Sequence, residues 1–267
     1  MRFKVDHDFH IHSHLSACSN HPEQTPENIL AYAKKNGLRK ICLTDHFWDE
    51  KVPGASDWYK PQNFAHITKA LPLPQAEGIS FYFGCESDMD KNFTIGVSAE
   101  RAKEFDFIIV PTTHMHMTGF TLSEEDAKSC ERRAELWVKR FDALLDSSMP
   151  FGKVGLAHIT CSLINYQKQS KEDLLKTLRL LPANEIHRLF ARAKDKGLAI
   201  EINMADMNRD ITDSEEVMRV YRIAKHQGCK FYLGSDAHKP AELAIAKDVF
   251  ERAVDLIGLE ESDKFEF

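Results

Sequence analysis

Asp8-Phe9-His10-Ile11-His12 ends the first apolar stretch of the chain. In an extended strand, residues i and i+2 point to the same face, so His10 and His12 present two imidazoles side by side. Two neighbouring imidazoles make up half of a typical metal site. Such a pair also arises by chance on surface strands, so this interpretation depends on the rest of the chain.

Strand-like apolar segments alternate with helical segments along the whole chain. We expect strands at 4–12, 40–46, 79–86, 107–111, 153–158, 198–203 and 230–236, and helices at 26–35, 64–71, 99–104, 123–145, 163–181, 182–196, 212–226 and 241–257. This alternation is typical of βαβ units with a parallel sheet. About seven units, without a linker or low-complexity segment, favour one α/β barrel domain over residues 1–267. The alternative is a doubly wound sheet.

Composition restricts the class of partner. The formal net charge is −6, so long-range attraction to nucleic acid or to an anionic membrane is not expected. A small substrate held by local groups fits better. No apolar run is long enough to cross a bilayer, and the N-terminus carries no signal-like segment. The six cysteines are scattered without a Cys-x-x-Cys pair, so we expect free thiols and a cytoplasmic location.

The expected strands share one feature at their C-terminal ends. Each strand ends at, or just before, a residue whose side chain can bind a metal or carries an amide. These residues are His10, His12, His46, Glu86, His114, His158, Asn203, Asp236 and His238. In a parallel barrel these ends meet on one face. Imidazoles and carboxylates without paired thiolates suit Zn, Mn or Fe. The set is too large for one ion, and Glu86 and Asp236 are the candidates for bridging two or three.

These motifs resemble the PHP (polymerase and histidinol phosphatase) superfamily over essentially the whole chain. The resemblance rests on His10-Ile11-His12, Thr44-Asp45-His46, Gly84-Cys85-Glu86, His114, His158, Glu201-Ile202-Asn203 and Gly234-Ser235-Asp236-Ala237-His238. The C-terminal part looks most like the histidinol-phosphatase branch. The resemblance implies a distorted (β/α)7 barrel, a centre of three divalent metals and metal-dependent hydrolysis of a phosphoester.

The resemblance also implies a division of the ligands among three ions. One metal would take His10, His12, Glu86 and Asp236, a second would share Glu86 and use His114 and His158, and a third would use His46 and His238. Family members usually supply a further His or Asp shortly after His-x-His, where this chain has Cys18. We expect Cys18 to bind the third metal, which would favour zinc. The alternatives are His14 or His21 as ligand, with Cys18 a small buried thiol.

Three further residues are candidates for binding substrate. His116 lies two residues after His114 and would contact substrate or replace His114, or else stay an exposed loop residue. Arg209 follows the Glu201-Ile202-Asn203 motif, where related phosphatases carry an arginine, and its guanidinium would grip phosphate or be solvated. Lys239 is a weaker phosphate candidate.

Other residues are expected to support the site rather than to react. Asp8 and Asp45 precede metal-binding histidines and are candidates for orienting imidazoles. Trp48, Trp58 and Tyr59, in the long loop 47–63, would wall one side of a pocket or form a lid. The family often has His-x-Asp after the fifth strand. This chain has His158-Ile159-Thr160 there, which leaves the identity of the substrate open.

The resulting hypothesis is a phosphatase acting on a small phosphate monoester, similar to histidinol phosphatases. Metal-activated water would attack phosphorus, with Glu86, Asp236 and Arg209 as the catalytic residues. The alternatives are a phosphodiesterase or exonuclease of the same superfamily, and a non-catalytic regulatory metal-binding module. An amidohydrolase-type enzyme fits the Ser-Asp-Ala-His motif less well.

Overall fold

The protein is an α/β fold built on parallel strands. The computed structural model describes residues 1–19, 21–165 and 170–266. In this part of the chain every strand pairing is parallel, within a sheet of order β1-β2-β3 and a sheet of order β4-β5-β6-β7-β8. The strands are β1 (His7–Ile11), β2 (Lys40–Leu43), β3 (Ser80–Phe83), β4 (Cys85–Glu86), β5 (Ile108–Val110), β6 (Val154–Leu156), β7 (Ala199–Asn203) and β8 (Phe231–Gly234).

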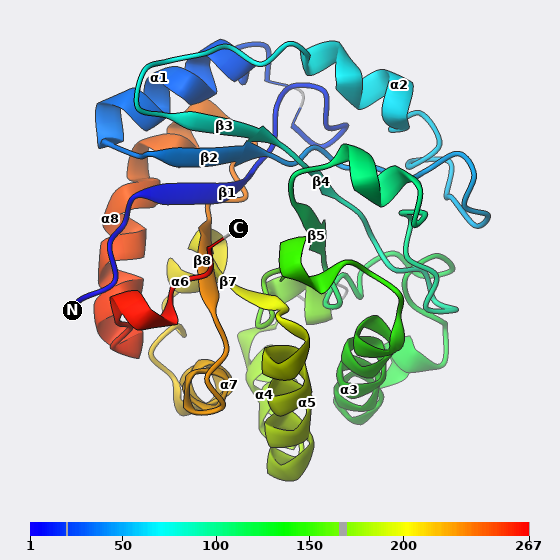
Figure 1. Ribbon diagram of the computed structural model, residues 1–267. Helices are drawn as coiled ribbons and strands as arrows, with labels where there is room; N and C mark the ends of the chain where they lie inside the picture. Colours follow the sequence, from blue (N-terminus) through cyan, green and yellow to red (C-terminus); the bar gives the residue numbers. More distant parts are fainter. Residues whose placement is uncertain (20, 166–169, 267) are drawn as a thin grey trace.

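The two sheets adjoin at both ends to form a distorted barrel (Figure 1). On one side, β3 and β4 follow each other directly and are separated only by Gly84. On the other side, the Asp236 amide donates to the His10 carbonyl at 2.7 Å and the His12 amide donates to the Ala237 carbonyl at 3.1 Å. Because β3 and β4 are one chain segment, the barrel has seven strand positions. The predicted barrel with its site at the strand ends is confirmed.

The strand expected at 79–86 is interrupted because Gly84 lies against the neighbouring strands. A Cβ atom at Gly84 would lie 2.4 Å from the Phe107 carbonyl oxygen and 2.8 Å from the Cys42 sulfur. The residues before Gly84 pair with β2, and the residues after it pair with β5. The glycine therefore lets one segment change partners, and it directs Glu86 toward the centre of the barrel.

Large side chains fill the inside of the barrel. A buried cluster separate from the main core consists of Phe9, Cys42, Phe107, Ile109, Ala157, Ala199, Tyr232 and Phe265. Phe265 comes from the C-terminal segment, whose backbone pairs with Phe231 at 2.8 Å. Figure 1 shows the last described residues beside β8, within the ring of strands. The end of the barrel opposite the strand C-termini is thus closed by packed side chains.

Helices surround the strands (Figure 1). They are α1 (Pro26–Asn36), α2 (Phe64–Ile67), α3 (Cys130–Asp146), α4 (Lys171–Leu180), α5 (Ala183–Lys196), α6 (Met204–Met207), α7 (Glu215–His226) and α8 (Pro240–Ile257). The expected signals set the ends of α1: the Thr25 side chain accepts from the Asn28 amide, and Gly37 ends the helix at φ 68°. The main core lies between these helices and the strands.

Several predicted helices differ from the structure. The segment expected at 64–71 is an α-helix only to Ile67 and continues as the 3-10 turn η1 (Thr68–Ala70). The segment expected at 99–104 is the 3-10 turn η2 (Arg101–Glu104), and the helix expected at 212–226 begins only at Glu215.

The helix expected at 123–145 begins only at Cys130, because the Ser129 hydroxyl caps it and a 3-10 turn, η3 (Asp126–Lys128), precedes it. The segment expected to be helical at 163–181 contains η5 (Ser162–Asn165) and α4, and its residues 166–169 lie outside the described residues. The division into a single domain over 1–267 stays a prediction.

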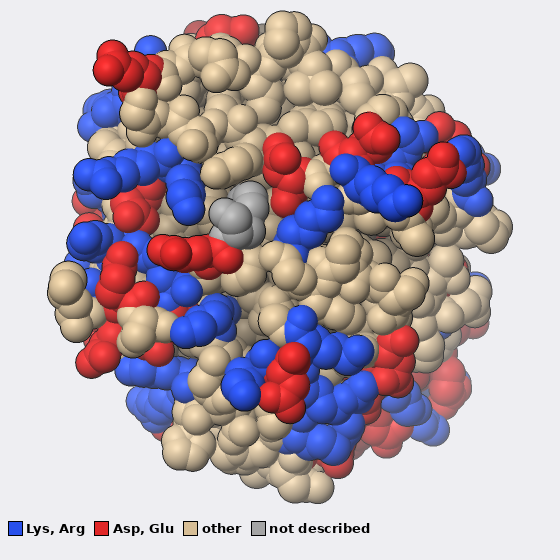
Figure 2. Space-filling view, in the orientation of Figure 1, with Lys and Arg blue, Asp and Glu red and all other residues tan. Residues whose placement is uncertain are grey.

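Charge is mixed on the face where the C-terminus emerges. Figure 2 shows Lys and Arg interspersed with Asp and Glu on this face, without one extended basic field. Among the described residues, no helix combines the length and the apolar character needed to cross a membrane.

Gly84→Ala should destabilise the protein by about 1–3 kcal/mol, because the new methyl group would overlap backbone atoms that cannot move independently. The free energy of unfolding in urea measures this. Gly152→Ala is the matched control, since a Cβ there meets nothing within 4 Å. Equal stabilities of the two variants would contradict the proposed role of Gly84.

Candidate metal centre

Glu86 lies at the centre of a cluster of imidazoles at the strand C-termini. Its Oε2 atom is 3.4 Å from His10 Nε2, 3.3 Å from His12 Nε2 and 3.2 Å from His46 Nδ1. Its Oε1 atom is 3.2 Å from His158 Nε2 and 4.0 Å from His114 Nε2. Only 1% of the Glu86 side chain is exposed. One carboxylate from β4 is therefore surrounded by imidazoles from four other strand ends.

Asp236 supplies a second carboxylate to the same cluster. Its Oδ1 atom is 3.1 Å from His12 Nε2 and 3.4 Å from His10 Nε2. His10 Nε2 and His12 Nε2 are themselves 3.1 Å apart, as ring nitrogens are when they share an ion. Three overlapping groups have donor atoms mutually close enough to hold a metal: His10, His12, Glu86 and Asp236; Glu86, His114 and His158; and His12, His46 and His238.

The local backbone around Asp236 explains why glycine precedes it. A Cβ atom at Gly234 would lie 2.0 Å from Glu201 Oε1 and 2.7 Å from the His10 Cβ. Only glycine leaves room for Glu201 beside His10. Asp236 and His158 both have positive φ angles, 53° and 29°. Non-glycine residues in such conformations are strained and tend to occur at functional sites.

Hydrogen bonds to the Nδ1 atoms leave the Nε2 atoms of five imidazoles available for ligation. Glu201 Oε1 lies 2.6 Å from His10 Nδ1, and Asp88 Oδ1 lies 2.8 Å from His114 Nδ1. The remaining partners are Ser16 Oγ for His12 (2.9 Å), Thr113 Oγ1 for His158 (3.1 Å) and the Asp236 carbonyl for His238 (2.7 Å). A proton on Nδ1 that is donated to an oxygen fixes the tautomer whose Nε2 lone pair binds a metal.

Glu201 and Asp88 were missed as site residues in the sequence. Glu201 also accepts from the His158 amide (2.7 Å) and from Asn203 Nδ2 (3.1 Å). Asp88 also accepts from the Tyr59 hydroxyl (2.7 Å). The signal was i, i+2 spacing: Asp88 shares a face with Glu86, and Glu201 shares a face with Asn203. Asn203 itself lies outside the three donor groups, because its Oδ1 caps α6.

The two aspartates expected to orient imidazoles act differently from each other. Asp45 Oδ1 accepts from the Ser16 hydroxyl at 2.7 Å, so it supports His12 through Ser16. Asp8 makes no such contact with an imidazole side chain. It accepts from the Ser235 amide (2.9 Å) and the Tyr32 hydroxyl (3.1 Å), and so ties β1 to β8 and α1.

Arg140 of α3 anchors the loops that carry the second donor group. Its side chain is fully buried and donates to the carbonyls of Met89, Asp90, Pro111, Thr112 and Thr121. These carbonyls belong to the segments after β4 and β5, which carry Asp88 and His114. Carbonyl oxygens satisfy the guanidinium without a carboxylate, although burial lowers its pKa to about 10.

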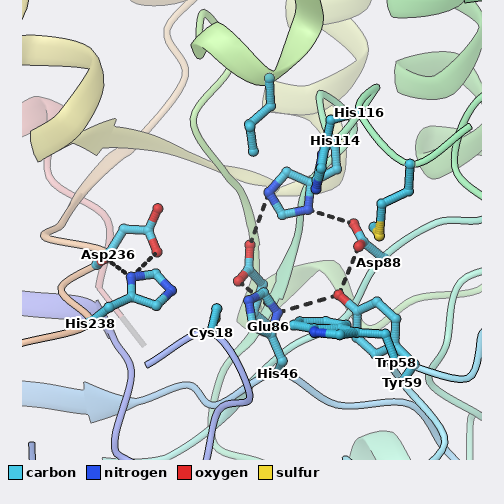
Figure 3. Close-up of a pocket in the computed structure, with 12 residues that line it drawn as sticks. Cys18, His46, Trp58, Tyr59, Glu86, Asp88, His114, His116, Asp236 and His238 are labelled. Atoms are coloured by element: carbon cyan, nitrogen blue, oxygen red, sulfur yellow. Dashed lines mark hydrogen bonds and ion pairs between the residues drawn. The ribbon is translucent and has the colours of Figure 1, made fainter. Parts of the chain in front are cut away.

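A pocket of about 420 Å³ opens over the cluster (Figure 3). Its lining includes Cys18, His46, Glu86, Asp236 and His238, together with Trp58, Tyr59, Asp88, His114, His116, Met117 and Leu163. Cys18 thus faces the same space as His46 and His238, although it is not in a donor group. Cys18 is exposed, so the alternative of a small buried thiol is wrong, and Trp48 is buried and is not in the described lining. The role of Cys18 as third-site ligand stays a prediction, as does the role of His116 in binding substrate.

Arg209 and Lys239 do not line this pocket. Arg209 Nη2 donates to the Thr160 carbonyl at 2.9 Å, and the residue lines a neighbouring cavity. Lys239 is 55% exposed and lies 3.5 Å from Glu242. Contact of either side chain with a phosphate over the metal cluster stays a prediction, because neither side chain is in the described lining of the pocket.

The carboxylates and imidazoles shift one another's protonation. Burial disfavours the charge on Glu86, yet the imidazoles of His46 and His10 hold its pKa well below the usual value. Burial likewise opposes a charged His12, yet hydrogen bonds to Asp236 and Glu86 raise its pKa to about 9. Burial lowers the pKa of His46 to about 3. The cluster thus holds ionised carboxylates, with protons retained on His12 where a cation would bind.

The affinity for a divalent metal should rise with pH between about 6.5 and 9. The proton on His12, whose pKa is raised from 6.5 to about 9, must leave before Nε2 can ligate. Because the pKa of His12 is higher in the folded protein than in the unfolded chain, its protonation stabilises the metal-free fold. This stabilisation is complete below pH 6.5 and is lost as the pH rises through 9. Competition with a chromophoric chelator at pH 7 and pH 8 measures the affinity. Equal affinity for zinc at both values would contradict this protonation scheme.

Comparison with known proteins places this chain in a family. The PHP domain family matches residues 8–205. A probable histidinol-phosphatase of Deinococcus radiodurans is 24% identical over 244 residues, which cover 88% of this chain and 87% of the relative. A probable phosphatase of Vibrio vulnificus is 25% identical over 263 residues, which cover 97% and 87%.

Solved structures share the fold. The crystal structure of histidinol phosphate phosphatase from Lactococcus lactis, complexed with zinc, L-histidinol and phosphate, has a TM-score of 0.62 at 18% identity and covers 98% of this chain and 99% of its own. A putative histidinol phosphatase from Listeria monocytogenes has a TM-score of 0.62 at 14% identity and covers 91% and 99%. Since the family match spans well over half of the sequence, this chain belongs to the PHP domain family.

Proposed function

We propose that the protein is a metal-dependent phosphatase that hydrolyses a small phosphate monoester, similar to histidinol phosphatases. The observation that carries this proposal is the set of three overlapping donor groups beneath an open pocket. One group shares Glu86 with the second group and His12 with the third. Shared donors bring two or three divalent ions close together, the arrangement that phosphoryl-transfer sites use. The family membership and the phosphatase names of the relatives support the same class of enzyme.

The donor set fits zinc, manganese or iron. It consists of imidazoles and carboxylates, and hydrogen-bond partners already orient most of the imidazoles. When bound, such ions would supply hydroxide at neutral pH and neutralise charge on the phosphoryl oxygens. We propose His10, His12, Glu86 and Asp236 for one ion, Glu86, His114 and His158 for a second, and His46 and His238 with Cys18 for a third.

The chain's own residues hold and enclose the reacting groups. Glu86 lies against imidazoles from four strand ends, and Asp236 lies against the two imidazoles of β1, so these carboxylates would hold the ions close to one another. Tyr59 and Trp58 wall the pocket beside His46. Partial desolvation inside the pocket and the carboxylates of Glu86 and Asp236 raise the pKa of Cys18, so its thiol stays protonated without a cation. A cysteine nucleophile is therefore disfavoured, and attack by water fits the site better.

Phosphate hydrolysis by the purified protein tests the proposal. The substrates are p-nitrophenyl phosphate, bis-p-nitrophenyl phosphate and histidinol phosphate, each with chelator and with added zinc or manganese. We expect turnover of the monoesters that chelator abolishes and metal restores, with histidinol phosphate the best substrate. A preference for the diester would move the protein to a phosphodiesterase function. No turnover with any metal would favour the regulatory metal-binding module.

Glu86→Gln should lower kcat by more than about 100-fold. Loss of a hydrogen-bond partner of a metal ligand typically costs about 10- to 100-fold, and the neutral amide of glutamine cannot bind two cations as a carboxylate can. The metal content per chain should fall in the same variant, which elemental analysis after dialysis measures. The matched control is Glu77→Gln, on the exposed surface, which should keep both values. Near-normal activity and metal content of Glu86→Gln would overturn the shared-ligand scheme.

A further inference from the structure

Trp58 is an exposed aromatic side chain at the mouth of the pocket. Among the described residues, the large apolar side chains exposed to solvent are Met1, Trp58, Leu71, Phe93, Leu180, Ile245 and Leu256, and of these only Trp58 lines the pocket. The residue is 37% exposed. A flat ring that covers this surface would bury apolar area at the pocket mouth, which is favourable.

The segment that carries Trp58 is anchored rather than free to move. The Tyr59 hydroxyl donates to Asp88 at 2.7 Å, and the Tyr59 side chain is fully buried. The buried Gln62 side chain donates to the Trp58 carbonyl at 3.1 Å and accepts from the Ala17 amide at 2.9 Å. These bonds join the turn to the loop after β1 and to the segment after β4. The position of the indole is therefore set before any ligand arrives.

Two ring contacts fix the orientation of the indole itself. The Trp58 ring packs edge-to-face against His46, with centroids 5.1 Å apart at 71°, and against Tyr59, with centroids 4.7 Å apart at 83°. Figure 3 shows Trp58 beside Tyr59 and His46, on the side of the pocket that these two residues line. An indole held in this way offers a flat surface directly next to the donor groups.

The charges that line the pocket restrict the ligand further. The charged residues in the lining are Glu86, Asp88 and Asp236, and the described lining contains no lysine or arginine. Bound cations would compensate one phosphate group. A second anionic group on the substrate would find no positive side chain in the described lining, and it would meet the carboxylate of Asp88, which lies outside the donor groups.

We propose that Trp58 is a specificity-determining residue that stacks on a flat aromatic ring in the alcohol portion of the substrate. The substrate class is then a phosphate monoester of an aromatic or heteroaromatic alcohol without a second anionic group. This inference rests on the proposed phosphatase function, because Trp58 would contact the alcohol portion while the phosphate group of the same substrate lies at the metal centre. Stacking on the indole contributes selectivity, and the electrostatics of the pocket exclude sugar bisphosphates and nucleoside polyphosphates.

The test compares benzyl phosphate with cyclohexylmethyl phosphate, using the metal-loaded enzyme. The two esters have similar size, equal charge and similar leaving alcohols, but only the first has a flat ring. The readout is the ratio of their kcat/KM values within each variant, so a general loss of activity cancels. We expect a ratio of about five in the native protein, within the roughly two- to tenfold range of aromatic stacking. The ratio should fall to about one in Trp58→Ala, through KM, and be partly retained in Trp58→Phe.

Phe93→Ala is the matched control, because Phe93 is also 37% exposed but does not line the pocket. Its ratio should equal that of the native protein. A further arm uses 4-carboxybenzyl phosphate, whose kcat/KM should be at least tenfold below that of benzyl phosphate. A native ratio near one, an unchanged ratio in Trp58→Ala, or equal rates for the carboxylated ester would overturn this inference alone. No turnover of any ester by the metal-loaded native protein would instead overturn the proposed function, and this inference with it.

Discussion

The burial of the Glu86 carboxylate is the constraint on which the centre depends. A charge that is removed from water costs several kcal/mol unless cations compensate it. Imidazoles from β1 and from the loops after β2, β5 and β6 surround this carboxylate, and they hold its pKa well below the usual value. Protons on the imidazoles compensate the carboxylates in the absence of metal, and divalent ions bound to the proposed donor groups would do the same. The same geometry would therefore stabilise the fold and hold the metals.

The outer hydrogen bonds turn a group of histidines into an ordered set of ligands. Glu201, Asp88, Ser16 and Thr113 each contact an Nδ1 atom. These partners come from strands and loops far apart in the sequence, so the orientation of each ring depends on the closed barrel. The orientation of the rings also depends on helix α3, because Arg140 of α3 binds the loops that carry Asp88 and His114.

The sequence predicted the barrel and the strand-end donors because both follow from period-two alternation and parallel pairing. It did not distinguish a ligand from its hydrogen-bond partner: Glu201 and Asp88 lie on the right strand faces, but spacing does not say which oxygen meets Nδ1 and which meets a metal. Loop residues were harder still. Arg209 and Lys239 follow strand ends but do not line the pocket, since no periodicity sets the direction of a loop. The start of α3 depended on one hydroxyl, that of Ser129.

The polarity of the pocket implies an order of binding under the proposed function. Without ions, a phosphate dianion would enter a space lined by Glu86, Asp88 and Asp236, and the described lining offers it no lysine or arginine. Like charges at this separation and degree of burial repel strongly. Cations in the donor groups would neutralise Glu86 and Asp236 and would give the phosphate its partners. Under the proposed function, metal loading would therefore precede substrate binding, and the side chains at the pocket mouth, Trp58 among them, would select the alcohol rather than attract the phosphate.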